Sequence, residues 1–134
     1  IIKSYFKDTI GVIIVIDDYT KKQLDNIKYW REEYYKKQSS NNPNVFFMVL
    51  LNKIDSFHEK ANFSLITDYC NDNNIMFYGV SAKSGCNVNE CFKEFTKYIY
   101  QETKDKNVKI KGIKKCTIEL DTPKQLRYSC CRIV

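Results

Sequence analysis

The sequence predicts an α/β fold of three layers, in which three parallel strands with flanking helices are followed by a flexible C-terminal tail. Two observations predict it. Short apolar runs rich in β-branched residues alternate with longer segments whose apolar residues recur at helical spacing. Each apolar run also ends abruptly in polar residues, as is typical of strands buried in a parallel sheet. With 134 residues, of which 43% are hydrophobic, the chain is long enough to bury one core.

The first strand is predicted at residues 11–18, GVIIVIDD, because this continuous apolar run is typical of a strand buried on both faces of a sheet. Residues 20–38 follow as a helix with charged residues on its outer side. Its inward face is predicted to carry five residues at helical spacing, namely Leu24, Ile27, Trp30, Arg31 and Tyr34.

The second strand is predicted at residues 45–51, VFFMVLL, and the third at residues 75–82, IMFYGVSA. Between them, residues 63–74 read as a short helix. Its apolar side is predicted to consist of Phe63, Ile66, Tyr69 and Cys70.

The last helix is predicted to begin after Asn87, whose side chain suits the N-cap position. Residues 1–103 are assigned to one folded domain, and residues 104–134, which lose all periodicity, to a tail. The apolar face of the last helix is predicted to consist of Val88, Cys91, Phe92, Phe95 and Ile99.

The net charge of +6 lies entirely in the tail, since residues 1–103 carry equal numbers of basic and acidic side chains. A basic tail on a neutral body indicates attraction to a polyanion, either anionic lipid or nucleic acid. Nucleic acid is disfavoured because Tyr128 is the tail's lone aromatic residue and offers no stacking platform. We therefore expect an anionic membrane surface as the partner.

The cysteines do not form a metal site by their spacing, because no two are arranged as C-x-x-C and the chain has one histidine. We expect Cys70, Cys86 and Cys91 to be reduced thiols that are at least partly buried. No apolar run approaches the roughly 20 residues that a bilayer-spanning helix needs.

Two polar motifs follow the second and third strands, at Asn52–Asp55 (NKID) and Ser81–Lys83 (SAK). Because ligands bind beyond the carboxyl ends of parallel strands, both motifs are expected to lie on one edge of the sheet. A guanine base would suit them, since its N1–H and N2–H2 donors match the carboxylate of Asp55. Adenine presents an unprotonated N1 there and would be rejected. The stem of Lys53 could cover one face of the base.

These motifs resemble the N-K-x-D and S-A-K motifs of the Ras-superfamily small GTPases, and the chain most resembles the Rab branch. The segment SYFKDTIGVIIVID is similar to the Rab sequence around the fourth strand, and the resemblance covers residues 1 to about 103. It implies a P-loop-NTPase-like fold that binds GTP or GDP. It also implies six guanine-binding residues: Asn52, Lys53 and Asp55 on the base, Ala82 through its backbone N–H, Ser81 bracing the loop and Lys83 packing on the ring.

The phosphate-binding half of such a site is not found in this sequence. A P-loop needs G-x-x-x-x-G-K-[ST], and no two of the four glycines are five residues apart. The DTIG stretch at residues 8–11 matches D-x-x-G but runs directly into a strand. We therefore assign no catalytic residue and no metal ligand, and expect Mg²⁺ only in the intact protein. The fold is expected to be an incomplete GTPase domain whose first strand presents an exposed apolar edge.

The tail ends in SCCRIV, and its adjacent cysteines Cys130 and Cys131 are candidate lipidation sites. Cys131 also begins a C-a-a-X pattern, in which Arg132 is a poor fit. The pair resembles the Rab pattern of double geranylgeranylation, and two lipids give stable anchoring. The resemblance implies a membrane-anchored switch in vesicle trafficking, on the cytoplasmic face of intracellular membranes with a cytosolic pool. Its partners would be a prenylation escort, regulators and effectors.

Two alternatives remain open from the sequence. The chain could be a shortened, non-catalytic GTPase relative that acts as a lipid-anchored interaction module. Alternatively, VIIVIDDY resembles the acidic pair of a receiver domain, with Asp55 as the phosphorylated residue and Ser81 as its hydroxyl partner. The receiver alternative lacks the later Lys-Pro that it requires and leaves Asn52 unexplained.

Overall fold

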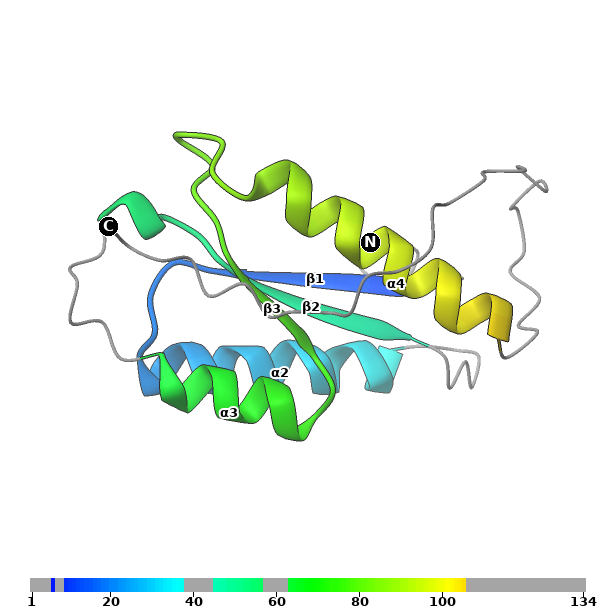
Figure 1. Ribbon diagram of the computed structural model, residues 1–134. Coiled ribbons are helices and arrows are strands. Elements are labelled where there is room, and N and C mark those ends of the chain that lie inside the picture. The colour runs from blue at the N-terminus through cyan, green and yellow to red at the C-terminus, as the bar shows by residue number, and fades with distance from the viewer. Residues whose placement is uncertain (1–5, 7–8, 38–44, 57–62, 106–134) are drawn as a thin grey trace.

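The computed structural model describes residue 6 and residues 9–37, 45–56 and 63–105. Helices α2 and α3 lie on one side of a parallel sheet and α4 lies on the other, so the predicted α/β fold of three layers is confirmed (Figure 1). The elements are, in chain order, β1 (Gly11–Ile16), α2 (Lys21–Lys37), β2 (Phe46–Leu51), the 3-10 helix η1 (Ile54–Ser56), α3 (Ser64–Asp72), β3 (Met76–Gly79) and α4 (Val88–Asp105).

The sheet has the order β1-β2-β3, and both pairs of neighbouring strands are parallel. The central strand β2 is buried along its whole length, as its uninterrupted apolar sequence predicts. Its last residue, Leu51, is level with Ile16 at the end of β1 and with Gly79 at the end of β3. The three strands therefore end at one edge of the sheet.

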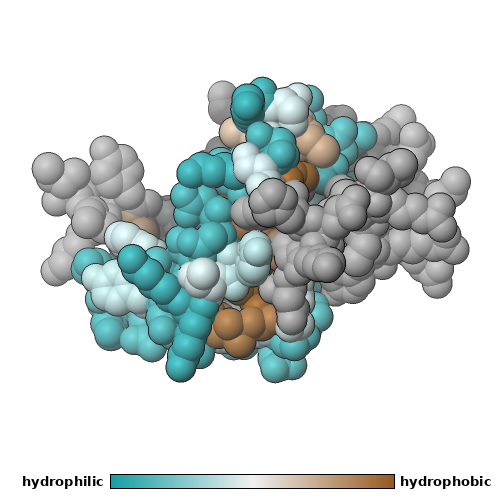
Figure 2. Space-filling view, turned by 90° about the vertical axis from the view of Figure 1, so that its left-hand side faces the viewer, coloured by the Kyte–Doolittle hydropathy of each residue, from teal (hydrophilic) through white to brown (hydrophobic). Residues whose placement is uncertain are grey.

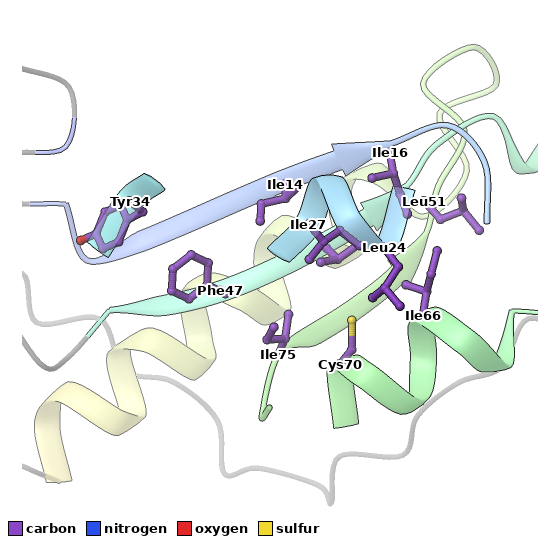
Figure 3. Close-up of a cluster of buried hydrophobic side chains, with 11 residues drawn as sticks. Ile14, Ile16, Leu24, Ile27, Tyr34, Phe47, Leu51, Ile66, Cys70 and Ile75 are labelled. Carbon is purple, nitrogen blue, oxygen red and sulfur yellow. The ribbon is translucent and has the colours of Figure 1, made fainter. Parts of the chain in front are cut away.

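Two apolar cores hold the layers together, one on each face of the sheet. The first core lies between the sheet and the helices α2 and α3, and Ile27, Val49 and Ile66 within it have no exposed surface (Figure 3). The second core joins the sheet to α4 through Met48, Cys91 and other side chains. The approach of α4 is close at Gly11, where an added Cβ would lie 2.8 Å from Ile99 Cδ1.

The outer strands are shorter than predicted: β1 ends at Ile16, before Asp17 and Asp18, and β3 covers only Met76–Gly79 of the predicted residues 75–82. The prediction that the first strand is buried on both faces was wrong. Val15 is 61% exposed, whereas Ile14 and Ile16 on the opposite face are buried. No strand pairs with the outer edge of β1 within the described residues, so one side of this strand lacks cover.

The helices match their predicted positions, although three side chains expected inside are exposed. Trp30 is 46% exposed and packs edge-to-face on Tyr29, because it lies on the flank of the buried stripe of α2. Phe92 on α4 is 47% exposed. The thiol-bearing residue Cys86 is also exposed, whereas Cys70 and Cys91 are buried free cysteines as expected.

The last helix continues to Asp105, so the predicted boundary between domain and tail at residue 103 falls inside α4. The remainder of the tail lies outside the described residues. None of the helices in the described part of the chain has both the length and the hydrophobicity needed to cross a membrane.

The uncovered β1 strand leads to a prediction about self-association. Replacing Val15 by Lys should reduce association of this chain, because a charged side chain on an edge strand disfavours strand pairing and apolar contact between copies. Light scattering coupled to size-exclusion chromatography measures the effect across a concentration series. Tyr29→Lys, at a position of α2 that is 54% exposed, adds the same charge away from the edge. An equal reduction by both variants would attribute the effect to net charge instead.

Candidate nucleotide-base site

The two motifs predicted from the sequence begin where β2 and β3 end. Asn52 follows β2 directly, and its backbone N–H donates to Ile16 O of β1 at 2.7 Å. On the other side, Val80 N–H donates to Leu51 O at 2.8 Å, and Ile54 N–H donates to Val80 O at 3.2 Å. Backbone hydrogen bonds thus hold the start of each motif beside its neighbour.

The first motif turns sharply at Lys53, whose backbone has φ = +66°. This left-handed conformation costs a residue other than glycine about 1–3 kcal/mol, and it persists where the surrounding structure enforces it. The turn ends the strand and starts η1, in which Ser56 N–H donates to Lys53 O at 2.9 Å. Asp55 lies within η1 and is exposed.

Ser81 makes the first of two hydrogen bonds that join the motifs. It is fully buried, and its Oγ donates to Asp55 Oδ1 at 2.6 Å while accepting from Ser84 N–H at 3.1 Å. Its backbone is bound as well, since its carbonyl accepts from Gly85 N–H at 2.8 Å and its N–H donates to Cys86 O at 3.0 Å. Ser81 therefore fixes the loop after β3 and orients the carboxylate of the loop after β2.

A second hydrogen bond between the motifs involves the two groups expected to face the base. Ala82 N–H donates to Asn52 Oδ1 at 3.0 Å. The backbone N–H of Ala82, which the resemblance assigns to the base, is therefore already bound to Asn52, and a ligand carbonyl would have to share or replace that bond. Lys83, the third residue of its motif, is exposed.

The loop that contains the second motif is closed by Asn87, which departs from its predicted role. Its carbonyl accepts the first helical hydrogen bond, from Cys91 N–H at 3.1 Å, so its backbone does hold the N-cap position. However, its φ is +58°, and its side-chain Nδ2 donates to Gly79 O at 2.9 Å. The side chain thus ties the start of α4 to the end of β3.

Asp17 is a site neighbour that the sequence reasoning missed. Its Oδ2 lies 2.8 Å from the Nζ of Lys53, and its Oδ1 accepts from Gln23 Nε2 at 3.1 Å. The available signal was its position: Asp17 follows β1 as Asn52 follows β2, so parallel register brings the two strand ends side by side.

Both charged residues of the first motif have shifted pKa values. The hydrogen bond from Ser81 lowers the pKa of Asp55, against a smaller opposing effect of desolvation, and the charge of Lys83 adds to the lowering. The hydrogen bond to Asp17 and its negative charge raise the pKa of Lys53. At neutral pH the site therefore presents an ionised carboxylate next to an ammonium group.

The face of the molecule that carries these loops is mainly hydrophilic where its described residues can be seen (Figure 2). Within the described residues, no group of three or more His, Cys, Asp or Glu side chains could hold a metal ion. The arrangement suits a polar, planar ligand that offers donors to Asp55. Cys130 and Cys131, the candidate lipidation sites, lie outside the described residues.

Comparison with known proteins gives consistent results. A family model described as the Ras family matches residues 1–101. Ras-related protein Rab-5B of Plasmodium falciparum is 32% identical over 102 residues, which are 75% of this chain and 47% of that protein. Ras-related protein Rab-7B of Dictyostelium discoideum is 26% identical over 132 residues, 96% of this chain and 65% of that protein. Ras-related protein RABG3a of Arabidopsis thaliana is 31% identical over 115 residues, 82% of this chain and 56% of that protein. The chain thus spans about half to two thirds of the length of these relatives.

The contact between Ser81 and Asp55 leads to a prediction that needs no ligand. Ser81→Ala should raise the pKa of Asp55 towards its ordinary value of 3.8, because the largest cause of its lowering is removed. A lowered pKa means that ionised Asp55 stabilises the folded state above pH 3.8 and that this contribution is lost as the pH falls through the lowered pKa. Titration of the Asp55 carboxyl carbon by NMR measures the shift.

The matched control is Ser56→Ala. Ser56 Oγ lies 3.5 Å from Asp55 Oδ2, a longer and weaker hydrogen bond than the 2.6 Å contact from Ser81. It should therefore move the pKa less than Ser81→Ala does. A larger effect of Ser56→Ala would mean that Ser81 does not control this carboxylate.

Proposed function

This chain belongs to the Ras family of small GTPases, and from that premise we propose that its two motif loops bind the guanine base of GTP or GDP. The curated relatives with which it aligns are Rab proteins, which places it in the Rab branch. Because the chain belongs to this family, we reject the alternative that it is a receiver-like domain. The observation that carries the proposal is the exposed, ionised carboxylate of Asp55, oriented by the buried hydroxyl of Ser81.

Asp55 is proposed to select the base. Its two oxygens accept the N1–H and N2–H2 groups of guanine in a bidentate pair, whereas adenine would place the lone pair of N1 against the carboxylate. A desolvated polar group left without a partner costs about 1–3 kcal/mol, which is about 5- to 150-fold in affinity. The hydrogen bond from Ser81 to Oδ1 supports this role because it fixes the plane of the carboxylate before the ligand arrives.

The other five residues are proposed to hold the base in place. Lys53 would cover one face of the ring with its alkyl stem, and Lys83 would pack on the base from the second loop. The amide of Ala82 would donate to guanine O6, sharing its hydrogen with Asn52 Oδ1 or leaving it. Ser81 would brace the second loop through its backbone and side-chain hydrogen bonds.

Members of this family generally bind GTP or GDP together with Mg²⁺. In the described part of this chain no acidic or imidazole cluster suits a metal ion, so we assign no residue to Mg²⁺. We likewise assign none to hydrolysis. GTP hydrolysis and the binding of phosphates and Mg²⁺ are proposed for the intact protein only.

We also propose that the intact protein acts as a membrane-anchored switch in vesicle trafficking. The basic tail and the cysteine pair Cys130–Cys131 support this role, because two lipids together with nearby lysines bind stably to an anionic bilayer. A prenylation escort would load the lipids. The protein would then be distributed between the cytoplasmic face of intracellular membranes and a cytosolic pool. Rab regulators and effectors would be its partners.

The proposed base site can be tested on this chain by NMR. Titration with GMP should shift the backbone amide signals of residues 52–55 and 81–83, whereas AMP at the same concentration should shift them much less. Because phosphate contacts are not assigned here, weak millimolar binding is sufficient for the test. Equal shifts with both nucleotides, or none with GMP, would contradict a guanine site.

Asp55→Asn should change the preferred base from guanine to xanthine. An amide presents one acceptor and one donor, which match the N1–H and O2 of xanthine and leave the N2–H2 of guanine opposed by a donor. The variant should therefore lose about tenfold in affinity for GMP relative to xanthosine monophosphate. The control is Asp68→Asn, which removes the same charge from an exposed position on α3 and should keep the preference for GMP.

A further inference from the structure

The two acidic residues after β1 share Gln23 Nε2, which lies 3.1 Å from Asp17 Oδ1 and 3.4 Å from Asp18 Oδ2, but their other contacts differ. Asp18 binds within the turn that leads into α2, where its Oδ1 accepts from Thr20 N–H at 2.9 Å and from Thr20 Oγ1 at 2.7 Å. Asp17 instead reaches across the strand ends to the Nζ of Lys53 at 2.8 Å. A stabilised turn accounts for Asp18 but leaves the contact made by Asp17 without a role.

The carboxylate of Asp17 is held from its other side by α2. Gln23 Nε2 donates to Asp17 Oδ1 at 3.1 Å, and Gln23 Oε1 accepts from Asn26 Nδ2 at 3.1 Å. The first turns of α2 therefore orient Asp17, and Asp17 in turn meets the ammonium group of Lys53. This chain of contacts joins a helix outside both motifs to the first motif.

The ion pair contributes little to stability, because both of its side chains are at least half exposed. The ion pair instead restricts the conformational freedom of the Lys53 side chain. A lysine side chain carries about 2 kcal/mol of rotamer entropy, part of which is lost whenever the stem is ordered on a ligand. The backbone of Lys53 is already fixed by its left-handed turn, so restraining its ammonium group confines the whole stem.

We propose that Asp17 is a positioning residue for base binding: together with Gln23, it holds the ammonium group of Lys53 so that the lysine stem is ordered before the base arrives. This inference rests on the proposed function, in which that stem covers the guanine ring. Asp17 does not touch the base in this scheme and acts through Lys53 alone. Its loss should therefore matter only while Lys53 is present.

A double-mutant cycle tests this dependence on the full 134-residue chain. The variants are Asp17→Asn, Lys53→Met and the two combined, and the measurement is the Kd for GMP from NMR titration. Asp17→Asn alone should weaken GMP binding about two- to fivefold, as expected for an exposed ion pair. In the Lys53→Met background it should have no further effect. The same loss in both backgrounds would overturn the proposal, because Asp17 would then act independently of Lys53.

A second measurement follows the contact itself without any ligand. The NMR signal of the Lys53 ammonium group should show faster hydrogen exchange in Asp17→Asn than in the unmodified chain. Asp25→Asn removes the same charge from an exposed position on α2 and should leave both this exchange and the Kd for GMP unchanged. Unchanged exchange in Asp17→Asn would overturn the proposal.

The GMP titration distinguishes this inference from the proposed function. If the unmodified chain does not bind GMP, the proposed function fails and this inference fails with it. If the unmodified chain binds GMP and Asp17→Asn binds it equally well, only the inference is rejected.

Discussion

The structure depends on the register of its three parallel strands. Ile16, Leu51 and Gly79 are paired across the sheet, so the chain leaves all three strands at the same level. The hydrogen bonds that follow, from Asn52 N–H to Ile16 O and from Val80 N–H to Leu51 O, extend this alignment by one residue into the loops. A shift of one residue between β2 and β3 would displace the two motifs relative to each other, and a shift between β1 and β2 would move Asp17 away from Lys53. The geometry of the candidate base site therefore depends on strand pairing as well as on its own side chains.

Polar groups that follow β1, β2 and β3 bind one another at this edge of the sheet. Asp55 accepts from Ser81, Asn52 accepts from Ala82, and Lys53 donates to Asp17. These contacts fix the loops at the cost of occupying groups that a base would use. The arrangement combines a strained turn at Lys53 with a fully buried serine, so the rigidity comes from the protein interior while the exposed carboxylate stays accessible. Such preorganisation reduces the entropy that binding has to offset.

The sequence was a good guide wherever periodicity and strand order decide the structure. The three strands, the helices and the common edge of the two motifs follow from apolar runs and from the rule that parallel strands end together. Sequence reasoning anticipated an exposed edge at the first strand, but it did not identify which side chains of that strand or of the α2 flank would be exposed. Val15 looks as apolar as its buried neighbours, but it lies on an edge strand, and Trp30 fits a helical stripe but lies at its border. Asp17 was missed because its partner, Lys53, is brought near only by pairing between distant segments.

The direction of α4 separates the candidate base site from the end of the described chain. The helix starts beside the end of β3, where Asn87 binds Gly79, and by Ile99 it has reached Gly11 at the beginning of β1. Its 18 residues span about 27 Å, so the chain leaves the helix at the end of the sheet opposite the base site (Figure 1). The two ends of the sheet therefore carry different parts of the chain: the loops of the candidate base site lie at one end, and the last described residues of α4 lie at the other.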